Sequence, residues 1–289
     1  MASLKEIKAR IASVQSTLKI TSAMKMVASA KLHKVQGVAE ALAEYERHLA
    51  DIAAAICRNS DAEVSSPLAV GHERCRRAVV VAFSSDNSLC GAFNANVIRE
   101  MTREVGALRS EGLSVEVWPV GEKIAQAAIK AEYPVKTDFR RRGGMPTYDD
   151  AVELARQLME RYLSGKVDRV VLVYNHFHST GHQAPRSEVF LPADFSSLGS
   201  SEGAASMPAD YIYEPDAGHL LASLIPYTVR IRMYEVLLDS ATAEHAARMV
   251  AMQTATDNAQ ELLGDLTLSY NKRRQQAITD ELADITQAG

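Results

Sequence analysis

The chain has 289 residues, of which 47% are hydrophobic and 24% charged, and its formal net charge is −4. This length fits one or two domains with a sizeable core. No apolar run approaches the roughly 18 residues of a membrane-spanning helix, and the start, MASLKEIKAR, lacks the apolar segment of a secretion signal. The three cysteines form no C-x-x-C pair, which favours free thiols in a reducing compartment. We therefore expect a soluble chain.

The N-terminal segment has the pattern of one long helix. Residues 1–57 contain no proline and a single glycine, and apolar residues recur at spacings of three and four, the a/d seam of a coiled coil. These residues are Leu4, Ile7, Ile11, Val14 and Leu18, then Val35, Val38, Leu42, Tyr45, Leu49, Ile52 and Ile56. A helix of about 54 residues is roughly 80 Å long, so we expect residues 1–58 to leave the globular part or run along a partner.

The C-terminal segment repeats this pattern. Residues 227–287 contain no proline and only one glycine, and Pro226 is expected to break or kink the helical run before them. Seam positions recur at Ala255, Ala259, Leu262 and Leu266, then at Ile278, Leu282 and Ile285. Two long helices at opposite ends of one chain predict an antiparallel pair, with residues 217–289 packed on the N-terminal helix. A pair that serves only as scaffold remains an alternative.

The charge is uneven along the chain. Residues 1–36 carry seven lysines and arginines against one glutamate, a net charge of +6 in an otherwise acidic protein. Such a run can be a solvated face, a nucleic-acid surface or a surface for an acidic protein partner. No aromatic residues interleave with the basic ones, so the protein partner explains the asymmetry best.

Between the ends, strand and helix patterns alternate. Strands are predicted at 77–83, 113–120, 167–177 and 187–192, and helices at 92–110, 122–132 and 148–165. This alternation predicts a central Rossmann-like α/β domain over 76–195 with a mostly parallel sheet. A Ser/Gly/Ala-rich surface loop and connector follows at 196–216.

A search for chemistry in this domain finds no nucleotide-binding or hydrolase motif. The stretch SSDNSLCGAF, residues 84–93, joins a predicted strand to a predicted helix, where α/β proteins often bind phosphate. Cys90 within it is a candidate thiolate, but no cation follows nearby, so a buried packing role is favoured. His176, His178 and His182 form a loose candidate metal cluster without an evident fourth ligand. We expect no catalytic, cofactor-binding or metal-binding residue.

The two ends resemble the γ subunit of the rotary F-type ATP synthase. The segment IKARIASVQSTLKITSAMKMVASAKLHKVQ resembles the family's N-terminal signature, K-I-T-x-A-M-x-M-V-A at its core. The segment RMVAMQTATDNAQELLGDLTLSYNKRRQQAITDELADI resembles its C-terminal signature. SSDNSLCG corresponds to the family's S-S-D-R-G-L-C-G, with Asn87 and Ser88 where arginine and glycine are usual. This departure removes a cation near Cys90.

The resemblance implies a rotor function without an active site. In this family the coiled coil stands inside a ring of three α and three β subunits. The central domain, with the ε subunit, sits on the membrane c-ring. Proton flow turns the c-ring and the shaft, which forces each β site through its binding states. ATP chemistry belongs to β, so the chain is expected to be a non-catalytic subunit without cofactor or metal. No nucleic acid is expected, and membrane contact only through the c-ring.

The resemblance also assigns contacts to residues. Those expected at the α3β3 interface are Lys8, Lys19, Met24, Lys25, Cys90, Arg248, Arg274 and Gln275, of which Arg248, Arg274 and Gln275 match positions that hydrogen-bond a loop of β. Small and Met side chains at Met24, Met26, Ala28 and Ala30 would allow the shaft to turn in its sleeve. Tyr211 and Glu214 match the region nearest the c-ring and the ε subunit.

Two other classes of protein remain open from the residues alone. One is a stand-alone α/β enzyme with helical oligomerisation arms, which predicts a ligand pocket at the carboxyl ends of the strands. The other is a coiled-coil adaptor that binds nucleic acid, which predicts steeply salt-dependent binding. The rotor interpretation places the chain on the cytoplasmic face of a bacterial cell membrane as a peripheral protein.

Overall fold

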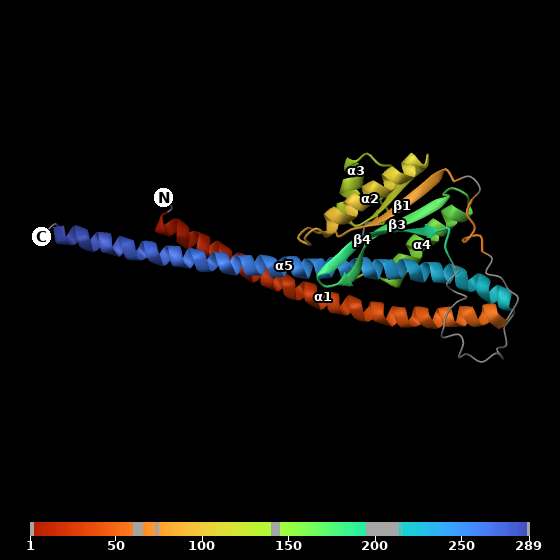
Figure 1. Cartoon of the computed structure of the whole chain (residues 1–289), viewed down its shortest axis with the longest axis horizontal. Coiled ribbons are helices and arrows are strands. Elements are labelled where there is room, and N and C mark those ends of the chain that lie inside the picture. The colour runs from red at the N-terminus through yellow and green to blue at the C-terminus, as the bar shows by residue number, and fades with distance from the viewer. Residues whose placement is uncertain are drawn as a thin grey trace. The chain divides into compact units, whose positions relative to one another are not determined.

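The computed structural model describes residues 3–59, 66–72, 75–139, 145–194, 214 and 216–287. Its elements are α1 (Leu4–Asn59), β1 (Arg77–Phe83), α2 (Phe93–Ser110), β2 (Ser114–Val120), α3 (Glu122–Lys130), α4 (Tyr148–Leu163), β3 (Arg169–Ser179), β4 (His182–Leu191) and α5 (Ala217–Gln287) (Figure 1). Across the described ranges, no helix has an apolar stretch suited to crossing a membrane.

The chain forms two compact units, and both long helices contribute to each. The terminal unit contains residues 1–30 and 248–289, and the central unit contains residues 31–247. The division therefore cuts across α1 and α5 instead of following the helix ends. Each unit is described by itself below.

The central unit is built on a four-stranded sheet with the order β2-β1-β3-β4. β1 pairs in parallel with both β2 and β3, and β4 pairs antiparallel with β3. Six of the seven residues of β1 are buried, as expected for a strand covered on both faces. The predicted mostly parallel α/β sheet is confirmed.

Helices cover both faces of this sheet, so the central unit has three layers (Figure 1). On one face, Val97, Met101 and Val105 of α2 and residues of α3 pack against the even-numbered residues of β1. On the other face, Leu158 of α4 and Met233 of α5 pack against the odd-numbered residues. The period of two along β1 thus supplies two separate cores.

Local sequence explains where two of these helices form. In α2, buried residues fall at 93, 97, 101, 105 and 108, which is one face of a helix. α4 begins with a capping box, because Thr147 Oγ1 accepts from the Asp150 backbone N–H while the Asp150 carboxylate accepts from the Thr147 backbone N–H.

Two sequence expectations differ from the structure in detail: the break that was one alternative at Pro226, and the start of the last strand. The helical run is not broken at Pro226, since α5 continues through it from Ala217. Ile225 and Val229 on either side are buried in the core, and this packing offsets the roughly 3 kcal/mol that a proline costs inside a helix. The last strand is also longer than the predicted 187–192, because it begins at His182 and forms a hairpin with β3.

The terminal unit consists of two antiparallel helical segments. Thr256 Oγ1 donates a hydrogen bond to Thr21 Oγ1 at 2.9 Å, and Lys25 Nζ donates to Gln253 Oε1 at 2.6 Å. The residue numbers of each facing pair add up to 277 or 278. The numbering thus rises along one helix as it falls along the other, so the two helices run in opposite directions. The predicted antiparallel pair is confirmed for this unit.

One predicted region lies almost entirely outside the described residues. The connector at 196–216 is described only at Glu214 and Asp216, and Tyr211 lies outside the described residues.

Candidate functional site

The turn between β1 and α2 is held by its own side chains. Ser85 Oγ donates to Asn87 O at 2.6 Å, and Asn94 Nδ2 donates to Ser85 Oγ at 2.8 Å and to Cys90 Sγ at 3.2 Å. Cys90 is 2% exposed and packs with Phe93. The thiol is thus a buried packing group, as the sequence favours, and its side chain offers no direct contact surface for a partner.

Side chains of the same turn accept hydrogen bonds from backbone N–H groups at the N-terminus of α3. Ser84 Oγ accepts from the Ile124 N–H at 2.9 Å, and Asp86 Oδ1 accepts from the Glu122 N–H at 3.1 Å. Gly121 has a φ of +106°, and a Cβ on it would lie 2.2 Å from Ser84 O. Backbone groups that hold phosphate in nucleotide-binding α/β proteins are here bonded to serine and aspartate. The backbone N–H groups of Glu122 and Ile124 are therefore already hydrogen-bonded within the chain.

The three histidines lie close together at the β3–β4 hairpin. The ring centroids of His176 and His178 are 4.5 Å apart, and those of His178 and His182 are 5.1 Å apart. His176 Nδ1 lies 2.5 Å from Asp239 Oδ2, and the Phe177 N–H donates to Asp239 Oδ1 at 2.8 Å. Within the described part of the chain, no three His, Cys, Asp or Glu residues are arranged to hold a metal. Asp239 instead fastens the hairpin to α5.

Seven of the eight residues assigned to the α3β3 interface lie in the terminal unit. Lys8 and Lys19 are exposed, while Met24, Lys25 and Arg248 are half-buried, and Lys25 is engaged by Gln253. The eighth, Cys90, belongs to the central unit.

Among the described residues of the terminal unit, the far end of α5 has no opposing helix. The register of the facing residues sets Leu4, the first residue of α1, opposite about residue 273. Arg274 and Gln275 are exposed at this point. Beyond them, the apolar seam residues Ile278 and Leu282 are 49% and 58% exposed. The predicted seam therefore continues where α1 supplies nothing to cover it.

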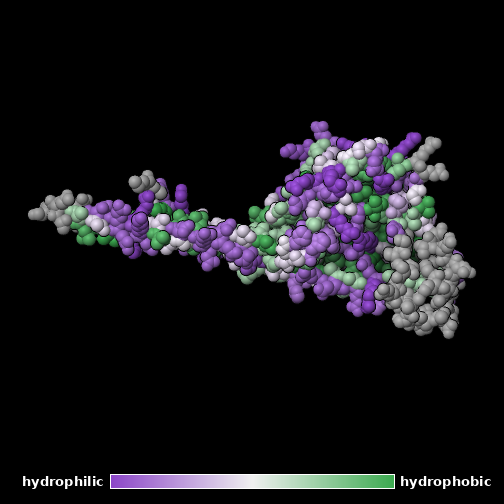
Figure 2. Space-filling model, viewed as in Figure 1, coloured by the Kyte–Doolittle hydropathy of each residue, from purple (hydrophilic) through white to green (hydrophobic). Residues whose placement is uncertain are grey.

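Exposed apolar residues also occur on the paired part of the terminal unit. Ile20, Met26 and Val27 on α1 are each more than half exposed, and so is Leu268 on α5. Figure 2 shows green patches between purple ones along these helices. Ala28 is buried in the pair, so the Met and small residues of this segment divide between the helix contact and the open surface.

The central unit contains a charged network that sequence reasoning missed. Arg232 Nη2 donates to both carboxylate oxygens of Glu188, at 2.7 and 2.9 Å, and Arg232 also pairs with Glu235. The Tyr174 hydroxyl donates to Glu188 at 3.2 Å. Burial and the neighbouring Glu235 raise the pKa of Glu46 to about 7. Glu188 on β4 lies 44 residues from Arg232, so no local pattern identifies this pair.

Glu214, which the resemblance places near the c-ring and the ε subunit, is exposed.

Comparison with known proteins gives matches over nearly the whole chain. A family model described as ATP synthase matches residues 3–288. The chain is 49% identical over 286 residues to the ATP synthase gamma chain of Phocaeicola vulgatus, covering 99% of this chain and 98% of that one. It is 38% identical over 285 residues to the gamma chain of Flavobacterium johnsoniae, covering 99% and 97%.

Solved structures with the same fold come from mitochondrial ATP synthases. A chain of the Euglena gracilis OSCP/F1/c-ring structure has a TM-score of 0.58 at 17% identity, covering 99% of this chain and 93% of that one. A chain of the Tetrahymena thermophila central stalk/c-ring structure has a TM-score of 0.53 at 23% identity, covering 82% and 99%. The fold, the identity to curated gamma chains and the whole-chain family match agree, and the chain belongs to the ATP synthase gamma chain family.

Proposed function

We propose that the chain is the central-stalk rotor subunit of a bacterial ATP synthase. It rotates inside the α3β3 ring and couples proton flow through the membrane c-ring to ATP synthesis at the β-subunit sites. Relatives from Phocaeicola vulgatus and Flavobacterium johnsoniae support a bacterial enzyme. The chain would be a peripheral protein on the cytoplasmic side of the cell membrane, with membrane contact through the c-ring.

The observation that carries this proposal is the uncovered end of α5. Ile278 and Leu282 continue a coiled-coil seam past the first residue of α1, and both are about half exposed. A leucine that stays in water lacks the roughly 1.5–3 kcal/mol of stabilising free energy that burial would supply. A surrounding sleeve of α and β subunits would bury these residues, whereas a scaffold hairpin would end with its partner helix.

Polar groups next to this end would transmit force to β. Arg274 and Gln275 are exposed and would hydrogen-bond a loop of β, together with Arg248. A rotor must make and break such contacts, and exposed charged pairs are weak enough for this, at about 0–1 kcal/mol each. Lys8, Lys19 and Lys25 would face acidic loops of β and orient the shaft electrostatically.

The central unit would carry the contacts at the membrane-side end. Its turn at 84–93, with Cys90 as internal packing, would lie close to the α3β3 ring. Tyr211 and Glu214 would lie nearest the ε subunit and the c-ring. ATP chemistry would take place on β, and this subunit would supply no catalytic group. The absence of a catalytic role is supported by Ser84 and Asp86, which accept hydrogen bonds from backbone N–H groups at the N-terminus of α3. A bound phosphate would need the same N–H groups.

Purification from native membranes through a tag on this chain tests the proposal. We expect α, β and ε subunits to co-purify in an assembly that hydrolyses ATP. Isolation of the chain alone, or with its own enzymatic activity, would favour a stand-alone enzyme. Co-purification with nucleic acid in a salt-sensitive complex would favour the adaptor. Either result contradicts the rotor.

A substitution then tests the contact at the end of the shaft. In the assembled enzyme, Arg274→Ala should lower ATP-driven proton pumping severalfold, because the shaft loses a charged hydrogen-bond donor to β. Lys272→Ala is a matched control, because it removes one exposed positive charge from another face of the same helical turn. Equal pumping by the two variants would remove the role given to Arg274.

A further inference from the structure

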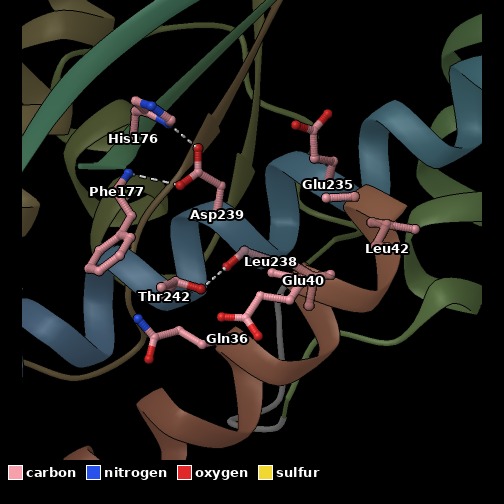
Figure 3. A pocket seen from close by; sticks show the side chains of 11 residues that line it. Gln36, Glu40, Leu42, His176, Phe177, Glu235, Leu238, Asp239 and Thr242 are labelled. Carbon is pink, nitrogen blue, oxygen red and sulfur yellow. Dashed lines mark hydrogen bonds and ion pairs between the residues drawn. The ribbon is translucent and has the colours of Figure 1, made fainter. Parts of the chain in front are cut away.

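The central unit has a pocket that the proposed function does not use. It has a volume of about 310 Å³ and is lined by eleven residues of α1, β3 and α5. Figure 3 shows Gln36 and Glu40 of α1 on one side, Asp239 and Glu235 of α5 on another, and His176 and Phe177 at the end of β3. The volume is at the lower end of the range for pockets that bind ligands, about 300–1,000 Å³.

The lining combines apolar walls with acidic groups. Leu42, Phe177 and Leu238 supply apolar surface, and two alanines of α1 leave room beside them. Glu40, Glu235 and Asp239 supply three carboxylates, and none of the eleven lining residues is a lysine or arginine. The pocket therefore offers apolar surface beside carboxylates, of which Glu235 already pairs with Arg232 and Asp239 with His176.

The polar groups of the lining differ in how well they are satisfied. The two oxygens of Asp239 are used by His176 and the Phe177 N–H, and Glu235 pairs with Arg232. Thr242 Oγ1 donates to Leu238 O. Gln36 and Glu40, by contrast, have no side-chain hydrogen bond to any described residue. They lie one helical turn apart on the same side of α1, and both line the pocket.

The chemistry of the lining excludes several occupants. An anion would meet the Glu40 carboxylate, which pairs with no described cation, and like charges repel each other. The described residues do not form a metal site. A wholly apolar side chain would take the Glu40 carboxylate away from water without giving it a partner, which is costly. What remains is a long side chain with an apolar stem and a positive end.

We infer that this pocket is a docking site for a lysine or arginine side chain of a partner polypeptide in the assembly. The aliphatic stem lies against Leu42 and Phe177, and the charged end donates hydrogen bonds to Glu40 and Gln36. This inference rests on the proposed function only because it requires the chain to work within a complex.

Site-specific photocrosslinking in the assembled, purified complex tests the inference. A benzophenone amino acid replaces Ala43, an exposed residue of the lining. The matched control carries the same group at Ala41, which is exposed on α1 but does not line the pocket. After irradiation we expect the Ala43 probe, and not the control, to link to one peptide of a partner subunit that contains a lysine or arginine at the linked position or within one helical turn of it.

A charge reversal decides whether the contact is electrostatic. Glu40→Lys should lower the yield of this crosslink by at least about fivefold, whereas Glu44→Lys, outside the lining, should leave it within about twofold. Reversing the identified basic residue of the partner to glutamate should restore the yield in the Glu40→Lys complex.

The outcomes separate this inference from the rotor proposal. A linked peptide without a basic residue, the same yield with Glu40→Lys, or no link to another subunit overturns the docking site. If α and β subunits still co-purify with the probe-bearing chain in that case, the rotor proposal stands while the docking site fails.

Discussion

The two units of this protein differ in how much of their apolar surface they bury, although both leave some large apolar side chains exposed. In the central unit, Trp118, Tyr162 and Leu172 are fully covered by the layers around the sheet. In the terminal unit, Ile20, Met26 and Leu268 are more than half exposed, and the buried positions include small residues such as Ala28 and Ala259. Figure 2 shows the exposed apolar residues of the terminal unit as green patches along the helices.

This difference indicates that the central unit covers its core with its own layers, whereas the terminal unit leaves apolar residues that only a partner could cover. A three-layer α/β unit buries its own core and needs no other chain. A two-helix unit buries only one stripe of each helix, so its remaining apolar residues need a partner or stay in water. Substitutions should therefore change the stability of the isolated chain in the central unit and change the assembly in the terminal unit.

The largest effect on the isolated chain is expected for Trp118→Ala. Trp118 is fully buried, its ring stacks on Phe139 at 5.4 Å between centroids, and Lys136 Nζ lies 4.4 Å from its centroid. Removing this ring should lower the free energy of unfolding of the central unit by about 3–5 kcal/mol, measured by urea unfolding with circular dichroism. Ile129→Ala on the exposed face of α3 is the control and should change it by less than about 0.5 kcal/mol. Similar losses in both variants would contradict the assigned core.

A smaller, pH-dependent effect is expected at Glu46, also in the central unit. Burial and Glu235 raise its pKa from 4.5 to about 7, and Arg232 opposes the rise. The folded chain therefore keeps this proton at pH values where the unfolded chain has lost it. Stability falls as the pH rises from about 4.5 to 7 and levels off above that. Glu46→Gln should remove this fall, which we expect to be about 1–2 kcal/mol after allowing for partial exposure.

Urea unfolding of both chains between pH 4.5 and 8 measures this difference. Glu44→Gln, an exposed neighbour on α1, is the control and should keep the pH profile of the original chain. Parallel profiles for the original chain and Glu46→Gln would show that Glu46 titrates normally.

Much of the fold is predictable because its signals are local. The apolar run of β1 predicts a buried strand at 77–83, the bounds that the structure gives. Thr147 followed by Asp150 is a capping pattern readable within four residues. The two terminal signatures also suffice to identify the family that the comparisons confirm.

The features that remained hidden depend on distant residues. Asp239 bonds to His176 across 63 residues of sequence, and Arg232 bonds to Glu188 across 44. The spacing of the seam also overstates burial, since Tyr45 and Ile52 fit the pattern but are 47% and 45% exposed. Periodicity predicts which face of a helix is apolar, but whether another element covers that face is decided by the tertiary structure.

The smallest effect on the isolated chain is expected for Leu282→Ser, at the uncovered end of α5. Leu282 is already 58% exposed, so the free energy of unfolding should change by less than about 0.5 kcal/mol. In the assembled enzyme the same change should weaken the retention of this subunit, because a sleeve that buries the leucine loses up to about 1.5–3 kcal/mol of apolar contact. Urea titration of the complex, scored by release of this chain from α and β, measures the loss.

Leu163→Ser makes the same substitution at a leucine of α4 that is 55% exposed, and it should leave both the isolated chain and the complex nearly unchanged. The comparison of the two serines isolates location, because residue type and exposure are matched. If Leu282→Ser destabilised the isolated chain instead, the end of α5 would already be covered within this chain. If it changed neither the chain nor the complex, no sleeve would bury it, and the uncovered seam would lose its place as the main support for the rotor.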